Sequence, residues 1–244
     1  MHQPLVFAHR GGRKHAPENT LPAFRGALAR GATGIETDAF LTRDGVVVLN
    51  HDAVVRTGWR EARPIRGLDR AQLPSSVPTL DDLLDVVGAG HDLFIDVKDV
   101  AALPGIADAV SSRRPARELR LWLAHAGFRE SDWRLVAGWA DAVPGAHLVD
   151  STSVRRMGGD PAGYLADVAR SPIGWLNLPI RQWTPELVEL ARNSGLQTMA
   201  FRVHRAGRAR RALRLGLDAV HGDDVDALVG AVAAEGAADS AQAA

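Results

Sequence analysis

Short apolar runs alternate along the chain with longer segments of helical periodicity. Eight of these runs have the length of buried strands, and they lie at residues 5–9, 34–40, 92–98, 119–125, 146–151, 174–179, 197–204 and 219–222. A further apolar run at 46–52 is expected to pair with the second strand or to follow it. Alternation of strands and helices over the whole length predicts a parallel α/β fold.

Three of the intervening segments carry helix-start signals. Asn19 is placed to cap the helix after the first strand, which is expected to end at Gly31. Thr79 precedes a helix with acidic residues in its first turn, which suits the helix dipole. Thr184 is followed by Pro185 at the first helical position. The pattern therefore predicts defined helix boundaries as well as strands.

Eight strands in a chain of 244 residues fit a (β/α)₈ TIM barrel, which typically has about 250 residues. A doubly wound open sheet is the rival architecture. The barrel is preferred because no glycine-rich dinucleotide-binding sequence follows the first strand, and because polar residues end most strands. We expect one domain over residues 1–232, with a short insertion at 54–78 after the second strand region, and a disordered tail of small polar residues at 233–244.

Acidic residues stand where the barrel would place an active site, near the carboxyl ends of strands. Glu36 and Asp38 share one face of the second strand, and Asp96 shares a face of the third with Lys98. Each acid could simply pair with an arginine or face solvent, which is the commoner situation for an isolated pair of this spacing. Three converging carboxylates, however, would repel one another, and a hard divalent cation such as Mg²⁺ or Ca²⁺ would relieve that repulsion.

Two histidines, His9 and His51, each follow an apolar run. A single histidine at a strand end is more often a packing residue than a catalyst. Two of them beside a carboxylate cluster are suited to act as a general acid and base, because imidazole titrates near neutral pH. Arg10 and Lys98 would supply positive charge for an anion. Together these groups favour phosphoester chemistry.

The composition narrows the range of partners and locations. Basic and acidic residues balance at 29 each, so no nucleic-acid partner is expected, and the arginine-rich stretch at 202–216 is interpreted as a solvated helix face. The chain has no cysteine, which excludes disulfides and thiolate metal sites. No signal-peptide pattern and no apolar run near the roughly 20 residues of a membrane span are present. We therefore expect a cytoplasmic protein without stable membrane insertion; the sequence indicates no oligomer interface.

Six segments, in this order, resemble the motifs of the glycerophosphodiester phosphodiesterase family: HRGGRKHAPENT at 9–20, ETD at 36–38, LTRDGVVVLNHD at 41–52, VPTLDDLL at 77–84, TPELVELARNSGLQTMAFRVH at 184–204 and LGLDAVHGDD at 215–224. The resemblance extends from residue 5 to residue 229. It implies a TIM barrel that hydrolyses a glycerophosphodiester to glycerol 3-phosphate and an alcohol, with one divalent cation, Mg²⁺ or Ca²⁺. It also implies a place in lipid and glycerol metabolism.

The resemblance also implies roles for individual residues. His9 and His51 correspond to the catalytic acid/base pair, and Arg10 and Lys98 to phosphate ligands. The implied metal ligands are Glu36, Asp38 and Asp96, and the implied substrate contacts on the seventh strand are Phe201 and His204. The family usually has Glu at the position of Asp96, and it often has Trp and Asn near Phe201 and His204.

Two other functions stay open at this point. The changes at Asp96 and on the seventh strand are compatible with a barrel that binds phosphate or a polyol phosphate without turnover. A phosphodiesterase acting on lysophospholipids would need an apolar rim, for which the short insertion, with Trp59 as its single tryptophan, gives little support. Retention of both histidines favours an enzyme. The sequence does not identify the alcohol group.

Overall fold

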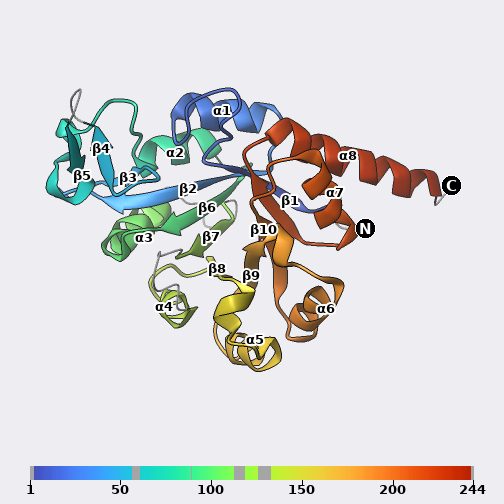
Figure 1. The fold of residues 1–244 in the computed structure, drawn as a ribbon. Helices are drawn as coiled ribbons and strands as arrows, with labels where there is room; N and C mark the ends of the chain where they lie inside the picture. The colour runs from blue at the N-terminus through green and yellow to red at the C-terminus, as the bar shows by residue number, and fades with distance from the viewer. Residues whose placement is uncertain (1–2, 57–60, 89, 113–118, 126–132, 243–244) are drawn as a thin grey trace.

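The computed structural model describes residues 3–56, 61–88, 90–112, 119–125 and 133–242. Within these residues, eight parallel strands form a closed barrel, because β1 pairs with both β11 and β2. Figure 1 shows helices surrounding this barrel, which confirms the predicted TIM-barrel fold. In barrel order the strands are β1 (Leu5–His9), β2 (Gly34–Leu41), β6 (Asp92–Val97), β7 (Leu121–Ala124), β8 (His147–Ser151), β9 (Ile173–Pro179), β10 (Gln197–Phe201) and β11 (Ala219–Gly222).

The helices follow the barrel strands in sequence and cover the outside of the barrel. They are α1 (Leu21–Ala29), α2 (Leu80–Val87), α3 (Leu103–Ser112), α4 (Trp133–Ala137), α5 (Pro161–Ala169), α6 (Pro185–Asn193), α7 (Ala206–Arg214) and α8 (Val225–Gln242). Short 3₁₀ turns complete them: η1 (Ile65–Gly67), η2 (Arg70–Gln72), η3 (Val100–Ala102), η4 (Val154–Met157) and η5 (Ile180–Gln182).

Two of the three predicted helix caps are confirmed, and the third is wrong. Thr79 caps α2 and Thr184 caps α6, each through its side-chain oxygen. The cap of α1 is Thr20 rather than Asn19. Asn19 adopts a left-handed backbone with φ of 51° and is buried. Its amide accepts a hydrogen bond from Thr37 and donates one to Asp38, so it joins the first loop to β2.

Alternation along the strands separates the barrel interior from the helix layer. On β6, Ile95 and Val97 pack in the large cluster under the helices, whereas Phe94 lies in the interior cluster. The interior cluster also holds Phe7 and Trp122, and their rings meet edge to face with centroids 5.2 Å apart. Burial of each such aromatic side chain contributes about 2–3 kcal/mol. Because these aromatic side chains fill the interior of the barrel, the polar side chains gather at its mouth.

The predicted insertion after β2 is short and lies at one side of the barrel, at the left of Figure 1. β3 (Val47–Leu49) pairs antiparallel with β2, which confirms the pairing expected of the run at 46–52. β4 (Val54–Arg56) and β5 (Ala62–Pro64) form a separate two-stranded sheet. A small core that includes Val55 and Leu68 fixes the insertion against β3. Trp59 lies outside the described residues.

The C-terminal helix α8 extends away from the barrel in Figure 1. It continues to Gln242, so residues 233–242 are helical where we expected a disordered tail. The segment is rich in alanine, which has the highest helix propensity, and this outweighs its lack of large apolar residues. In the described part of the chain, no helix is both long and apolar enough to span a membrane.

Gly222 is predicted to be essential for the junction of β11 with the segment after β10. A Cβ atom at this position would lie 2.6 Å from the carbonyl carbon of Val203, a distance that real Cβ atoms do not show. We expect Gly222→Ala to lower the free energy of unfolding by about 2 kcal/mol or more, because rigid backbone cannot yield to the added methyl group. Denaturant unfolding followed by circular dichroism measures this.

The matched control is Gly230→Ala, on an exposed part of α8 where nothing lies within 4 Å of the added Cβ. Alanine there is expected to stabilise the protein by up to about 1 kcal/mol, because glycine is a poor helix former. Equal unfolding midpoints for Gly222→Ala and the wild type would contradict the close approach of the two backbones.

Candidate active site

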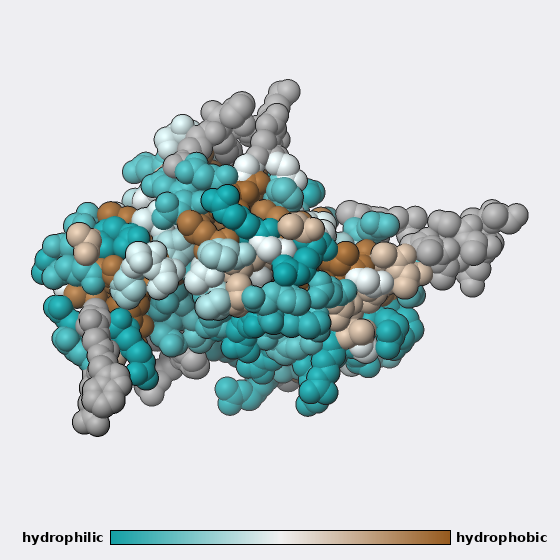
Figure 2. Space-filling view, turned by 90° about the horizontal axis from the view of Figure 1, so that it is seen from above, coloured by the Kyte–Doolittle hydropathy of each residue, from teal (hydrophilic) through white to brown (hydrophobic). Residues whose placement is uncertain are grey.

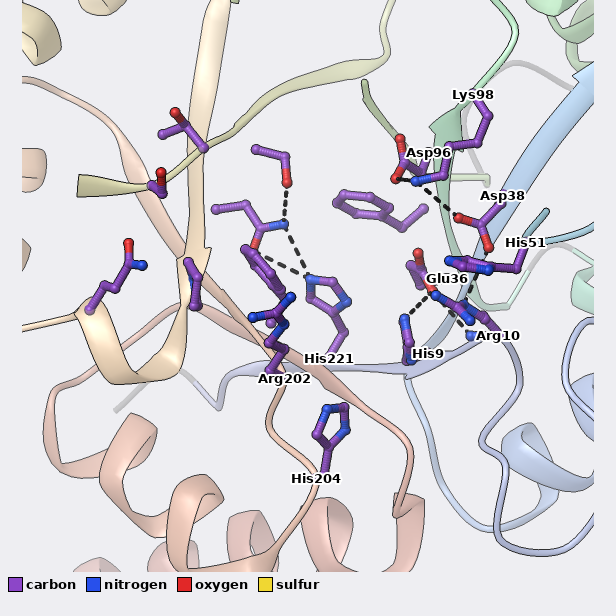
Figure 3. Close-up of a pocket in the computed structure, with 18 of the residues that line it drawn as sticks. His9, Arg10, Glu36, Asp38, His51, Asp96, Lys98, Arg202, His204 and His221 are labelled. Atoms are coloured by element: carbon purple, nitrogen blue, oxygen red, sulfur yellow. Dashed lines mark hydrogen bonds and ion pairs between the residues drawn. The ribbon is translucent and has the colours of Figure 1, made fainter. Parts of the chain in front are cut away.

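A cavity of about 530 Å³ opens at the carboxyl ends of the barrel strands. All nine side chains that the sequence nominated line it, and Figure 3 shows most of them around its centre. They are His9, Arg10, Glu36, Asp38, His51, Asp96, Lys98, Phe201 and His204. The structure therefore brings together residues that are spread over almost the entire sequence.

The three carboxylates are placed by the pairing of β2 with β6. In this register Glu36 lies opposite Phe94, and Asp38 lies opposite Asp96. Because Phe94 faces the barrel interior, the alternation turns all three acids toward the mouth. Their exposed fractions are only 4% for Glu36, 2% for Asp38 and 7% for Asp96. Buried charge of one sign requires compensation from neighbouring groups.

Lys98 supplies part of this compensation. Its Nζ lies 2.5 Å from Oδ2 of Asp96 and 3.3 Å from Oδ1 of Asp38. Burial alone would lower the pKa of Lys98, but the two carboxylates outweigh burial and raise the pKa above its usual value. Lys98 is therefore charged, and it bridges β2 and β6 at the rim of the barrel.

Arg10 lies at the start of the loop that follows β1, with a left-handed backbone at φ of 53°. Its Nη1 donates to Oε1 of Glu18 at 3.2 Å. Its Nε lies 3.4 Å from Oδ2 of Asp38 but is buried without a hydrogen-bond partner within the described residues. The guanidinium group of Arg10 is thus held between Glu18 and Asp38 where it lines the cavity, and such a group suits binding of a phosphoryl oxygen.

Glu36 is the least compensated of the three acids. Its Oε2 accepts a hydrogen bond from the backbone N–H of Arg10 at 3.0 Å and lies 4.0 Å from Nε2 of His9. Burial raises the pKa of Glu36 to about 7; the charge of His9 opposes this, and the charges of Asp38 and Asp96 add to it. The surroundings of Glu36 therefore need further positive charge.

The chemistry of this donor set fits a hard divalent cation, because all three side chains offer carboxylate oxygens. As they stand, no three His, Cys, Asp or Glu side chains in the described ranges are arranged to hold a metal ion. Lys98 already binds Asp96 and approaches Asp38. A cation would thus have to compete with the Lys98 ammonium group for these two carboxylates.

Both predicted catalytic histidines have the same hydrogen-bond arrangement. Nδ1 of His9 lies 2.6 Å from Oδ1 of Asp223, and Nδ1 of His51 lies 2.8 Å from Oδ1 of Asp52. An ionised carboxylate only accepts, so Nδ1 donates and Nε2 is the nitrogen left for proton transfer. The two tethers differ in exposure, since 17% of the Asp223 side chain is accessible and 71% of the Asp52 side chain.

Asp223, which directly follows the last strand and was not among the predicted site residues, is the hydrogen-bond partner of His9. Burial would raise the pKa of Asp223, but the hydrogen bond with His9 and the charges of His9, His204 and Arg13 lower it to about 2. Burial likewise opposes protonation of His9, and the charge of Glu36 and the bond to Asp223 raise its pKa above the usual value. His9 and Asp223 therefore form a strongly coupled pair.

The opposite wall is built by β8, β9, β10 and the turns that follow them. Asn177 of β9 donates to Oγ of Ser151 at 3.1 Å and lies 3.2 Å from Nε2 of His221. His221 is also buried in this wall, and burial together with the charges of His9 and His204 keeps its pKa well below the usual range. Neither Asn177 nor His221 was among the predicted site residues. The local indication in the sequence is that Asn177 is the only polar residue in the apolar segment GWLNLP.

Phe201 and His204 complete this wall. The Phe201 ring lies 5.8 Å from the His221 ring, centroid to centroid. Nδ1 of His204 lies 3.2 Å from Oδ2 of Asp223, and burial, more than any other influence, lowers the pKa of His204. This side of the cavity thus has the aromatic ring of Phe201 beside histidine and asparagine side chains, and Arg202 follows directly.

A closed barrel whose mouth combines two carboxylate-bound histidines, buried acids and oriented cations defines a TIM-barrel enzyme acting on an anionic substrate. The model of the glycerophosphoryl diester phosphodiesterase family matches residues 9–227. The chain belongs to this family and is a phosphodiesterase, which confirms the resemblance found in its motifs.

Individual relatives agree with this assignment. The glycerophosphodiester phosphodiesterase of Caldanaerobacter subterraneus subsp. tengcongensis is 28% identical over 244 residues, with 93% of this chain and 97% of that protein covered. The probable glycerophosphodiester phosphodiesterase 2 of Mycobacterium tuberculosis is 29% identical over 265 residues, covering 97% and 94%. A phosphodiesterase of Oleispira antarctica, solved in complex with the product sn-glycerol-3-phosphate, shares the fold with a TM-score of 0.81 at 21% identity, covering 94% and 97%.

Proposed function

We propose that this protein hydrolyses glycerophosphodiesters to glycerol 3-phosphate and an alcohol, with a divalent cation and with His9 and His51 as general acid and base. The observation that carries the proposal is the pair of histidines, each bound at Nδ1 by a carboxylate, beside three buried acids in one cavity. The substrate class is supported by the family and by the names of its relatives.

Glu36, Asp38 and Asp96 would hold the cation, Mg²⁺ or Ca²⁺, which would supply positive charge to the phosphoryl oxygens. The raised pKa of Glu36, due first to its burial, supports the need for such charge. Arg10 and Lys98 would bind the phosphate. The guanidinium group of Arg10 lines the cavity beside Glu18 and Asp38, whereas Lys98 would give up part of its contact with Asp96 and Asp38.

The proton transfers follow from the orientation of the two imidazoles. A water molecule or the 2-hydroxyl group of the substrate attacks phosphorus, Nε2 of one histidine removes its proton, and the P–O bond to the alcohol breaks. Attack by water gives glycerol 3-phosphate directly, whereas attack by the 2-hydroxyl group gives a cyclic phosphate that water then opens to glycerol 3-phosphate. Nε2 of the other histidine donates a proton to the leaving alcohol oxygen. Asp223 holds His9 in the required tautomer. Phe201 and His204 contact the glycerol portion of the substrate.

The alternatives receive less support. A binding protein would need neither histidine in a proton-transfer arrangement. A lysophospholipid would need an apolar rim. Among the described residues, the exposed large hydrophobic side chains are Val54, Val100, Leu135 and Val154, and none of them lines the cavity. Figure 2 shows one face on which hydrophilic residues predominate and hydrophobic ones lie in separate patches. The cytoplasmic location, the role in lipid and glycerol metabolism and the absence of a nucleic-acid partner stay predictions.

Release of glycerol 3-phosphate is the direct test. The protein is expected to release it from at least one member of a panel of glycerophosphodiesters in a coupled assay. EDTA should abolish release, and Mg²⁺ or Ca²⁺ should restore it, because the buried acids need the added charge. Absence of cation-dependent release from every panel member would refute the proposed function.

Removal of either catalytic histidine should leave the fold intact and suppress turnover. His9→Ala and His51→Ala are each expected to lower kcat by about 10²-fold or more, since a positioned acid or base contributes at least that much. Steady-state kinetics with a circular dichroism control measures this. Near-wild-type activity of either variant would show that the acid/base assignment is wrong.

The two tethering carboxylates provide a matched comparison within this test. Asp223→Asn is expected to lower kcat by about 10-fold with little change in KM, because it misorients His9 without removing a substrate contact. Asp52→Asn should have the smaller effect, since Asp52 is largely exposed to water. A larger effect of Asp52→Asn would contradict the assignment of Asp223 as the main positioning residue.

Asp96→Glu tests the proposed third cation ligand. The extra methylene group lets the carboxylate extend farther past Lys98, so the cation concentration for half-maximal activity should fall several-fold. Titration of activity with Mg²⁺ and with Ca²⁺ measures it. Asp108→Asn, an exposed change on α3, is the control and should leave the titration unchanged. If Asp96→Glu left the cation concentration for half-maximal activity unchanged, or raised it, this result would argue against a cation at Asp96.

A further inference from the structure

The charged side chains that line the cavity differ between its two sides. On the side of β1, β2 and β6, each cation is paired with a carboxylate: Arg10 with Glu18, Arg13 with Asp223 and Lys98 with Asp96. On the side of β8, β9 and β10, the lining side chains include Arg155, Arg156 and Arg202 but no acid. Figure 3 shows Arg202 across the cavity from Glu36, Asp38 and Asp96.

Two short segments position these arginines. Arg155 and Arg156 lie on η4, whose first residue, Val154, donates its backbone N–H to Oε1 of Gln182 at 2.9 Å. Arg202 follows β10 with a left-handed backbone at φ of 61°, and its guanidinium carbon lies 5.7 Å from the Phe201 ring centroid. Such a backbone is unfavourable for a non-glycine residue and is found mainly where the surrounding structure requires it.

Arg155 and Arg202 have no carboxylate partner within the described residues. Exposed arginines are often only solvated. Here, however, they come from two separate turns and line the same cavity as the reacting groups. The planar guanidinium group is suited to bidentate binding of phosphate or carboxylate. The positive wall is thus available to an anionic part of a ligand.

The cavity has room for more than the reacting phosphate. Its volume of about 530 Å³ lies in the range of sites that enclose a whole small-molecule ligand. In the proposed function, on which this inference rests, Arg10, Lys98 and the cation serve the reacting phosphate. We infer that Arg155 and Arg202, with Arg156 beside them, bind a second negative charge on the alcohol portion, so that the enzyme prefers glycerophosphodiesters whose alcohol carries a phosphate or carboxylate group.

A matched pair of substrates tests the inference. Glycerophosphoglycerol has a neutral alcohol, and bis(glycerophospho)glycerol has the same alcohol extended by a second phosphodiester. We expect kcat/KM to be about 10-fold higher for the second compound, well above the twofold factor for its two equivalent bonds. This excess should shrink as the salt concentration rises. Glycerophosphoserine tests a carboxylate as the second charge, and glycerophosphocholine, with a cationic alcohol, should be the poorest substrate.

Variants assign the preference to the arginines. Arg155→Gln and Arg202→Gln should each reduce the ratio of the two kcat/KM values several-fold, and the double variant should reduce it to about the statistical factor. Arg210→Gln, an exposed change on α7, is the matched control and should leave the ratio unchanged. The salt dependence of the wild type provides evidence that does not depend on the folding of any variant.

The outcomes separate this inference from the proposed function. No hydrolysis of any compound would refute the proposed function itself. Hydrolysis of glycerophosphoglycerol without a preference for the anionic alcohol would overturn only the subsite. A preference that persists in the double variant would also overturn it. Equal losses of kcat/KM on both substrates in the arginine variants would also overturn the subsite, because they would assign the arginines to the reacting phosphate.

Discussion

The burial of three carboxylates at the mouth of the barrel is the constraint on which the rest of the site depends. Glu36, Asp38 and Asp96 are turned inward by strand alternation and by the register of β2 with β6. Buried acids of one sign are costly unless positive groups surround them. Lys98 and the backbone amide of Arg10 supply part of that compensation, and the raised pKa of Glu36 shows that it is incomplete. An uncompensated negative site of this kind favours the binding of a cation.

The same constraint explains the lysine in the strand FIDVKD. Asp96 and Lys98 point to the same side, and in the structure they form an ion pair that also reaches Asp38. A single ammonium group can therefore balance two acids from neighbouring strands. Because Lys98 is paired with both acids, binding of a cation or of a phosphate at this site would be linked to a rearrangement of Lys98. Asp96, shorter than the Glu usual in the family, keeps its carboxylate close to Lys98.

The sequence predicted much of the fold because barrel strands are short apolar runs that end in polar residues, and this pattern is local. The residue that caps α1 was harder to predict from the sequence. Asn19 and Thr20 both favour N-cap positions, and only the tertiary bonds of Asn19 to Thr37 and Asp38 decide between them. The pairing of His9 with Asp223 spans 214 positions of sequence, so no local pattern could show it. The helix at residues 233–242 was not predicted, because this segment has few large apolar residues. Its high alanine content favours a helix all the same.

The residues that line the cavity fall into two groups, one from the first strands of the barrel and one from the later strands. The acids, the two histidines and the cations paired with them come mainly from β1, β2, β6 and the segments after them, where four of the six motif segments lie. The opposite wall comes from β8, β9, β10 and the turns that follow them, which contribute neutral polar groups together with Arg155, Arg156 and Arg202, and no acid lines this side of the cavity. Chemistry at phosphorus is common to all substrates of such an enzyme, whereas the alcohol differs between them. The side of β1, β2 and β6 therefore carries the groups suited to the reaction at phosphorus, and the opposite wall, beyond the residues proposed to contact the glycerol portion, has room for side chains that would distinguish one alcohol from another.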